Sequence, residues 1–169
     1  MQLGRLIRHT TATQLRTRAL FPKATLDAIE QAVARAETAH GGEIRFAIET
    51  SLAPVYIFSD MAPRVRALEV FGSLRVWDTE HNNGVLIYLQ LADRTVEIVA
   101  DRGFRNRISS AEWEAVCRLM EEHFRAGRFE IGSVAGVEAV SELLARHFPP
   151  DTKHATHPRN QLPDRPALL

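Results

Sequence analysis

Oxygen-bearing side chains gather in residues 77–84, immediately before the most apolar stretch of the sequence. This run contains Asp78, Asn82 and Asn83. Carboxylate and amide oxygens are the ligands that hard divalent cations prefer, so the run is a candidate calcium or magnesium site. It is not an EF-hand loop, because Asn83 stands where that loop requires glycine. The alternative interpretation is a simple turn at Asn83-Gly84, a pair that readily adopts positive φ.

A hairpin would bring a second group of polar residues to the same place. Residues 85–91 and 95–100 have the pattern of two antiparallel strands, so the residues before the first and after the second lie at one end of the sheet. We therefore expect Asp101 and Arg102 beside the first group. In this hypothesis Arg102 binds an anion such as phosphate, and four side chains bind the cation: Asp78, Asn82, Asn83 and Asp101. The alternative is an ordinary surface ion pair between Arg102 and one of the acids, which contributes about 0–1 kcal/mol.

Three further charged residues are secondary candidates. Asp93 and Arg94 form the turn between the two strands and so lie at the opposite end of the hairpin, where the alternative is a solvated turn. Glu130 follows Phe129. Its alternative interpretation is an acid at the start of a helix, where the positive end of the helix dipole favours a negative charge. One compact site cannot easily include both ends of the hairpin.

The familiar catalytic motifs do not occur in the sequence. It has no G-x-S-x-G, no G-x-x-x-x-G-K-[ST], no H-E-x-x-H and no C-x-x-C, and its seven histidines have no metal-ligand spacing. The single cysteine, Cys117, falls among apolar residues on one face of a predicted helix, which favours a protonated, inert thiol. No organic cofactor is indicated, and the catalytic residues of any enzyme remain unassigned.

Composition narrows the class of protein. The chain has 169 residues and carries 21 basic and 21 acidic side chains, a balance that argues against a protein whose whole surface binds nucleic acid. Residues 1–20 are basic and contain no acid; they form an arm or helix that packs on its own domain or contacts a membrane surface. No run approaches the roughly 20 apolar residues that span a bilayer. Together with the single cysteine, this predicts a cytoplasmic protein without a transmembrane segment.

The periodicity of apolar residues predicts one α/β domain. The first helix is expected at about 24–39 and a second after a cap at Ser59 or Asp60. A third is expected after the capping box of Ser109 and Glu112, and a fourth near the end of the domain. Strands are expected over residues 43–50, 85–91 and 95–100. The order α-β-α-β-β-α-α predicts a mixed sheet with helices on both faces, a three-layer α/β/α sandwich. The divisions are residues 1–20 for the arm, 21–149 for the domain, and 150–169 for a proline-rich, disordered tail.

Two central motifs resemble the TPM-domain family. Residues 82–88, NNGVLIY, and 92–98, ADRTVEI, are similar to its core, and residues 124–129, FRAGRF, match a later part of its pattern. The resemblance covers about residues 24–148 and implies a sandwich of Rossmann-like appearance. The family includes thylakoid-lumen proteins of photosystem repair and an accessory protein of acetylcholine receptors. Many members carry a signal peptide and a membrane anchor. The sequence shows neither signal, so this chain is expected to resemble a short cytoplasmic branch of the family.

The resemblance implies two functions, because some members are described as acid phosphatases and some bind calcium. The first hypothesis is a binding or assembly module in which a divalent cation at one end of the sheet helps to recognise a partner protein. The second is a metal-assisted phosphatase, in which a cation polarises a phosphate ester and Arg102 stabilises charge. A contact of residues 1–20 with a membrane surface or with nucleic acid is a third hypothesis.

Overall fold

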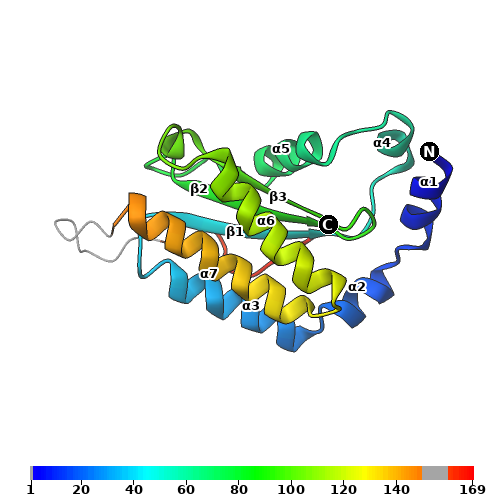
Figure 1. The fold of residues 1–169 in the computed structure, drawn as a ribbon, viewed down its shortest axis with the longest axis horizontal. Coiled ribbons are helices and arrows are strands. Elements are labelled where there is room, and N and C mark those ends of the chain that lie inside the picture. The colour runs from blue at the N-terminus through cyan, green and yellow to red at the C-terminus, as the bar shows by residue number, and fades with distance from the viewer. Residues whose placement is uncertain (1, 150–159) are drawn as a thin grey trace.

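The computed structural model describes residues 2–149 and 160–169, which form seven α-helices and a four-stranded mixed sheet (Figure 1). In chain order the elements are α1 (Gln2–Thr11), α2 (Gln14–Leu20), α3 (Lys23–Ala36), β1 (Glu43–Glu49), α4 (Pro54–Phe58), α5 (Pro63–Ser73), β2 (Gly84–Gln90), β3 (Thr95–Ala100), the 3-10 helix η1 (Arg102–Phe104), α6 (Ser110–Arg125), α7 (Phe129–His147) and β4 (Ala167–Leu168).

The sheet has the order β3-β2-β1-β4. Strand β1 runs parallel to both β2 and β4, and β2 and β3 form the expected antiparallel hairpin with Gln90 opposite Thr95. The chain crosses from β1 to β2 through α4 and α5. Every residue of β1 and β2 is buried, as the unbroken apolar run of β2 predicts for a strand covered on both faces.

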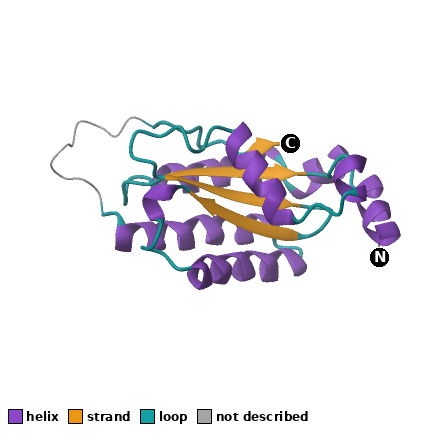
Figure 2. Ribbon diagram, turned by 90° about the horizontal axis from the view of Figure 1, so that it is seen from above, coloured by secondary structure: helices purple, strands orange, loops and turns teal. Residues whose placement is uncertain are grey.

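The two faces of the sheet pack against different helices (Figure 2). One face meets α3, α6 and α7 through the larger apolar cluster, to which β1 contributes Phe46 and β2 contributes Ile87. The other face meets α5 and the C-terminal residues through Ala47, Leu86 and Tyr88. The expected three-layer α/β/α sandwich is confirmed, and its layers follow from side chains that alternate across each strand.

Local signals place some helix ends correctly and others not. The side chain of Ser109 accepts a hydrogen bond from the backbone of Glu112, and Glu112 binds back to Ser109, which confirms the capping box. The cap expected at Ser59 or Asp60 is wrong. Helix α5 begins at Pro63 after Ala62, with no side-chain cap. The ring of proline fixes φ near the helical value, and proline has no N–H that would need a hydrogen-bond acceptor in the first turn.

The chain termini add structure outside the predicted core. Helices α1 and α2 pack on the body of the protein, and none of the helices in residues 2–149 is long and apolar enough to cross a membrane. The prediction of a disordered tail is wrong for residues 160–169, which lie against β1 and include β4. Polar groups of β1 bind this segment's backbone, an interaction that proline content alone does not reveal. Residues 150–159 lie outside the described part of the chain.

Candidate functional site

The loops at the amino end of β2 and the carboxyl end of β3 meet, as the hairpin predicts. The Gly103 N–H donates to the Asn82 carbonyl at 3.0 Å, and Arg102 Nε donates to Asn82 Oδ1 at 2.7 Å. The Asp101 carboxylate accepts from the Arg102 N–H at 2.6 Å and so begins the 3-10 helix. The structure thus brings together Asn82, Asp101 and Arg102, but Arg102 is held by an amide.

Asp78 is engaged elsewhere. Its Oδ2 lies 2.7 Å from Arg75 Nη2 in an ion pair whose two side chains are about half exposed or more. Within residues 2–149 and 160–169 no group of three or more histidine, cysteine, aspartate or glutamate side chains is placed to hold a metal ion. The divalent-cation site of Asp78, Asn82, Asn83 and Asp101 therefore stays a prediction.

Two oxygens at this end of the sheet are nevertheless buried without a hydrogen-bond partner in the described structure. They are Asn83 Oδ1 and Asp101 Oδ2. Asn83 is 4% exposed, its Nδ2 donates to the Gly41 carbonyl, and its backbone N–H donates to Thr79 Oγ1. Buried polar atoms usually have partners, so these two oxygens are the part of the predicted site that the geometry still favours.

The expected turn at Asn83-Gly84 is built differently. Positive φ occurs at Asn82, at 53°, whereas Gly84 already opens β2. Glycine is needed at position 84 for space, because a Cβ there would overlap the backbone carbonyl of Val76. Gly84 is therefore required because a side chain would not fit there, and not because the backbone needs a positive φ.

At the opposite end of the hairpin, Asp93 is a buried anchor rather than part of a solvated turn. Its side chain is 8% exposed and lies 2.7 Å from Arg5 Nη2 and 3.2 Å from His9 Nε2, both on α1. Burial opposes the charged form, but the hydrogen bond from Arg5 and the charges of His9 and Arg5 hold the pKa of Asp93 below its usual value. Asp93 therefore fixes α1 against the β2–β3 turn.

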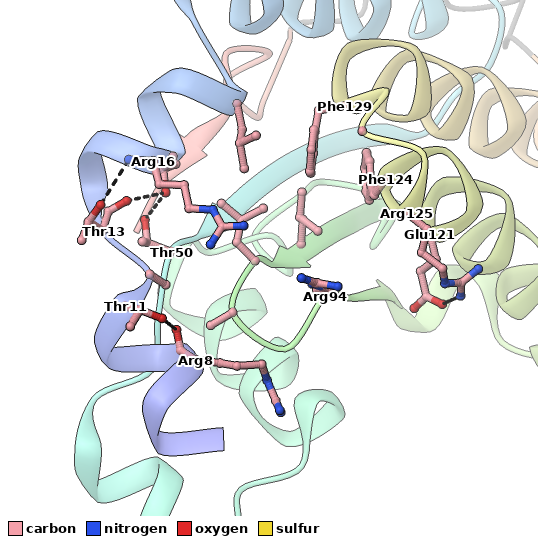
Figure 3. A pocket seen from close by; sticks show the side chains of 17 residues that line it. Arg8, Thr11, Thr13, Arg16, Thr50, Arg94, Glu121, Phe124, Arg125 and Phe129 are labelled. Carbon is pink, nitrogen blue, oxygen red and sulfur yellow. Dashed lines mark hydrogen bonds and ion pairs between the residues drawn. The ribbon is translucent and has the colours of Figure 1, made fainter. Parts of the chain in front are cut away.

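The next residue, Arg94, lines a cavity of about 270 Å³ at the carboxyl ends of β1 and β2 (Figure 3). This is the end of parallel strands at which α/β folds commonly bind ligands. The cavity is bounded by α1 and α2, by the residue after β1, by the β2–β3 turn and by the junction of α6 and α7. Its lining residues are Arg8, Thr11, Ala12, Thr13, Arg16, Thr17, Leu20, Thr50, Leu89, Leu91, Ala92, Arg94, Glu121, Phe124, Arg125, Gly127 and Phe129.

Positive charge dominates the polar part of this cavity. Four arginines and one acid line it, and the acid, Glu121, is held by Arg125 at 3.1 Å and by the Val96 N–H. Arg16 and Arg94 extend into the cavity from α2 and from the turn, and neither guanidinium has a hydrogen-bond or ion-pair partner among the described residues. Guanidinium groups without a carboxylate partner are suited to bind an anion.

The remaining wall is apolar. Phe124 and Phe129 stack with ring centroids 5.3 Å apart and an interplanar angle of 13°, and both line the cavity. Leu20 and Leu91 complete this side. A few charged groups beside an aromatic and aliphatic wall suit a ligand that carries an anionic group on an apolar body.

Glu130 serves a structural contact. It lies in the first turn of α7, and its Oε2 accepts a hydrogen bond from Thr25 Oγ1 on α3 at 2.8 Å. Among the three secondary candidates only Arg94 lines the cavity. Arg16 was not predicted, although Thr13 caps α2 through the Arg16 N–H, and a threonine three residues before a helical arginine could have placed it.

Comparison with known proteins gives the family. The pattern of the TPM domain matches residues 16–143, and no curated protein matches the sequence. The NMR structure of the BA42 protein from the psychrophilic bacterium Bizionia argentinensis is 31% identical, with a TM-score of 0.70, covering 86% of this chain and 93% of that one. The N-terminal domain of a P. gingivalis protein, 21% identical with a TM-score of 0.58 over 76% of this chain and 81% of that one, shares the fold. The domain match spans most of the chain, which therefore belongs to the TPM-domain family.

Proposed function

We propose that this chain is a TPM-type binding module whose cavity takes a small molecule with an anionic group, such as a phosphate monoester, on an apolar body. The observation that carries this function is the pair Arg16 and Arg94, which reach one cavity from distant segments and meet no carboxylate among the described residues. The stacked rings of Phe124 and Phe129 supply the surface for the apolar part.

Binding is favoured over phosphate-ester hydrolysis by the separation of the two sheet ends. The predicted cation ligands lie at the amino end of β2 and the carboxyl end of β3, whereas the cavity lies at the carboxyl end of β2. Seven strand residues separate these ends by roughly 20 Å. A cation held by Asp101 would therefore not reach an ester bound at Arg94. The carboxylate that lines the cavity, Glu121, is already held by Arg125.

Calorimetric titration with phenyl phosphate tests this function. Arg94→Gln and Arg16→Gln should each weaken binding about tenfold, the loss of one charge-assisted contact at a partly exposed site. Arg18→Gln is the matched control, since Arg18 is exposed on the same short helix but does not line the cavity. Equal affinities for all four proteins would contradict the proposal, and release of phosphate that depends on Arg94 would replace binding with hydrolysis.

The divalent-cation site is kept as a second proposal, because Asn83 Oδ1 and Asp101 Oδ2 are both buried and without partners in the described structure. Calcium or magnesium that binds there should raise the melting temperature by linkage. Asp101→Asn should abolish this increase, whereas Asp78→Asn should leave most of it, because the Asp78 carboxylate is already paired with Arg75 at 2.7 Å. No increase with either ion would remove the site.

A further inference from the structure

Residues 160–169 occupy the outer edge of β1. Their last residue, Leu169, accepts a hydrogen bond at 3.3 Å from the N–H of Thr50, one of the residues that line the cavity. Strand β4 runs parallel to β1, with Ala167 beside Ala47. The Leu169 N–H donates to the Ile48 carbonyl at 2.9 Å. The segment thus adds a short strand to an edge that would otherwise present unpaired backbone groups.

One end of the segment is held by a carboxylate of β1. The Oε2 atom of Glu43 accepts hydrogen bonds from the backbone N–H groups of Gln161 and Leu162, at 3.1 and 3.2 Å. Glu43 is 6% exposed. This contact recognises the main chain rather than particular side chains.

The middle of the segment is held by a guanidinium of β1. Arg45 Nη1 donates to the carbonyl of Pro163 at 2.7 Å and to that of Arg165. Glu43 and Arg45 are two residues apart and so project from the same face of the strand. Together they bind donors and acceptors of an extended chain, which is how a sheet edge recognises a peptide.

Three side chains of the segment add selectivity. Leu162 is buried in the apolar cluster on the α5 face, and Pro166 is also buried. Arg165 lies 3.1 Å from Asp27 and 2.7 Å from Glu30 on α3. The edge therefore suits an extended segment with an apolar residue and a proline four positions apart. It also favours a basic residue immediately before that proline, because Asp27 and Glu30 of α3 lie at that position.

The β1 edge and the segment that lies on it belong to different parts of the chain. Glu43, Arg45, Asp27 and Glu30 all lie inside the TPM domain match, which ends at residue 143, whereas the occupant begins at residue 160. The contacts of residues 160–169 are mostly to their backbone and at the edge of the sheet. Such edge segments open at a lower free energy than a central strand.

We propose that the β1 edge is a peptide-binding site, occupied in cis by residues 160–169, which can instead receive an extended segment of a partner protein with the same pattern. The partner segment would add a parallel strand beside β1. Glu43 and Arg45 would bind its backbone, and the Leu162 and Pro166 sites would take its apolar residue and its proline. This inference is independent of the anion-binding cavity.

The test uses the full chain and a fluorescent peptide with the sequence of residues 160–169. Leu162→Asp should release the chain's own segment, and fluorescence anisotropy should then show at least tenfold tighter peptide binding than to the original protein. That margin is a minimum, because a segment tethered in cis competes at an effective concentration of about millimolar. Asn160→Ser, at an exposed position of the segment, is the matched control and should behave like the original protein.

Further variants separate the outcomes. Arg45→Met in the Leu162→Asp chain should weaken peptide binding at least tenfold, and a peptide with aspartate at both apolar positions should not bind. A folded Leu162→Asp chain that fails to bind the peptide would overturn the proposal. Hydrogen exchange of the unaltered protein is a second test, which also serves if Leu162→Asp does not fold. Protection of the 162–169 amides as strong as that of the β2 amides would likewise overturn the proposal. A concentration-dependent dimer that Leu162→Asp dissolves would make a second copy the occupant and overturn the choice of a partner protein.

Discussion

Replacing Arg66 by methionine should destabilise the fold more than any exposed ion pair could. Arg66 Nη2 and Nε lie 2.8 and 3.1 Å from the carboxylate of Glu49 at the end of β1. The Tyr88 hydroxyl donates to the same carboxylate, and Glu49 is 5% exposed. Without Arg66 the buried carboxylate would keep only one strong donor.

The expected loss follows from this burial. Removing one partner of a fully buried ion pair costs about 3–5 kcal/mol, and the Arg66 side chain is 20% exposed, so we expect about 2–4 kcal/mol. Urea unfolding at pH 7 measures it. A second change, Glu49→Gln, should recover part of the loss, because an amide oxygen still accepts from Tyr88 without carrying an unpaired charge.

The control is Arg118→Met, which removes an exposed helix pair that Arg118 forms with Glu114 at 3.8 Å. This change should cost less than about 0.5 kcal/mol. If Arg66→Met costs as little as Arg118→Met, the reasoning about the buried carboxylate is wrong.

Three further predictions concern other parts of the fold. Burial raises the pKa of Glu37 to about 8. The fold thus favours the protonated acid, and this stabilisation is complete below about pH 4.5 and is lost as the pH rises through 8. Glu37→Gln should therefore make unfolding free energy more constant between pH 5 and 9; an unchanged alkaline slope would contradict it. Gly84→Ala should cost more than about 2 kcal/mol in urea unfolding, because its Cβ meets the Val76 carbonyl, and a neutral effect would show that the loop can move. Asp93→Ala should make residues 4–11 more sensitive to protease at pH 7, because α1 loses the contacts of Arg5 and His9 with Asp93. Equal cleavage rates would mean that the remaining contacts, such as that of Arg5 with the Met61 carbonyl, hold α1.

The central sheet could be predicted from the sequence because its signals are local and agree with one another. The unbroken apolar run of β2, the alternation in β3 and the turn between them fix a hairpin, and the hairpin correctly places Asn82 beside Arg102. The capping box at Ser109 likewise places the start of α6. In each case neighbouring residues carry all of the information.

Contacts between distant segments could not be predicted in the same way. The pairing of Asp93 with Arg5 spans 88 positions, and nothing near the turn indicates that its acid is buried by the N-terminal helix. That contact holds α1, which supplies Arg8 and Thr11 to the cavity, and the following helix α2 supplies Arg16. Local spacing can also mislead about burial. Val65 and Leu68 have the spacing of a buried helical face, yet both residues are about half exposed.

An NMR titration of the isotope-labelled protein with phenyl phosphate locates the bound ligand relative to the two ends of the sheet. We predict that the amide shifts concentrate at the carboxyl ends of β1 and β2, at Thr50, Leu91 and Arg94, and saturate with a single affinity. Shifts centred instead on Asn82 and Arg102 at the opposite end, or none at saturating ligand, would contradict the account.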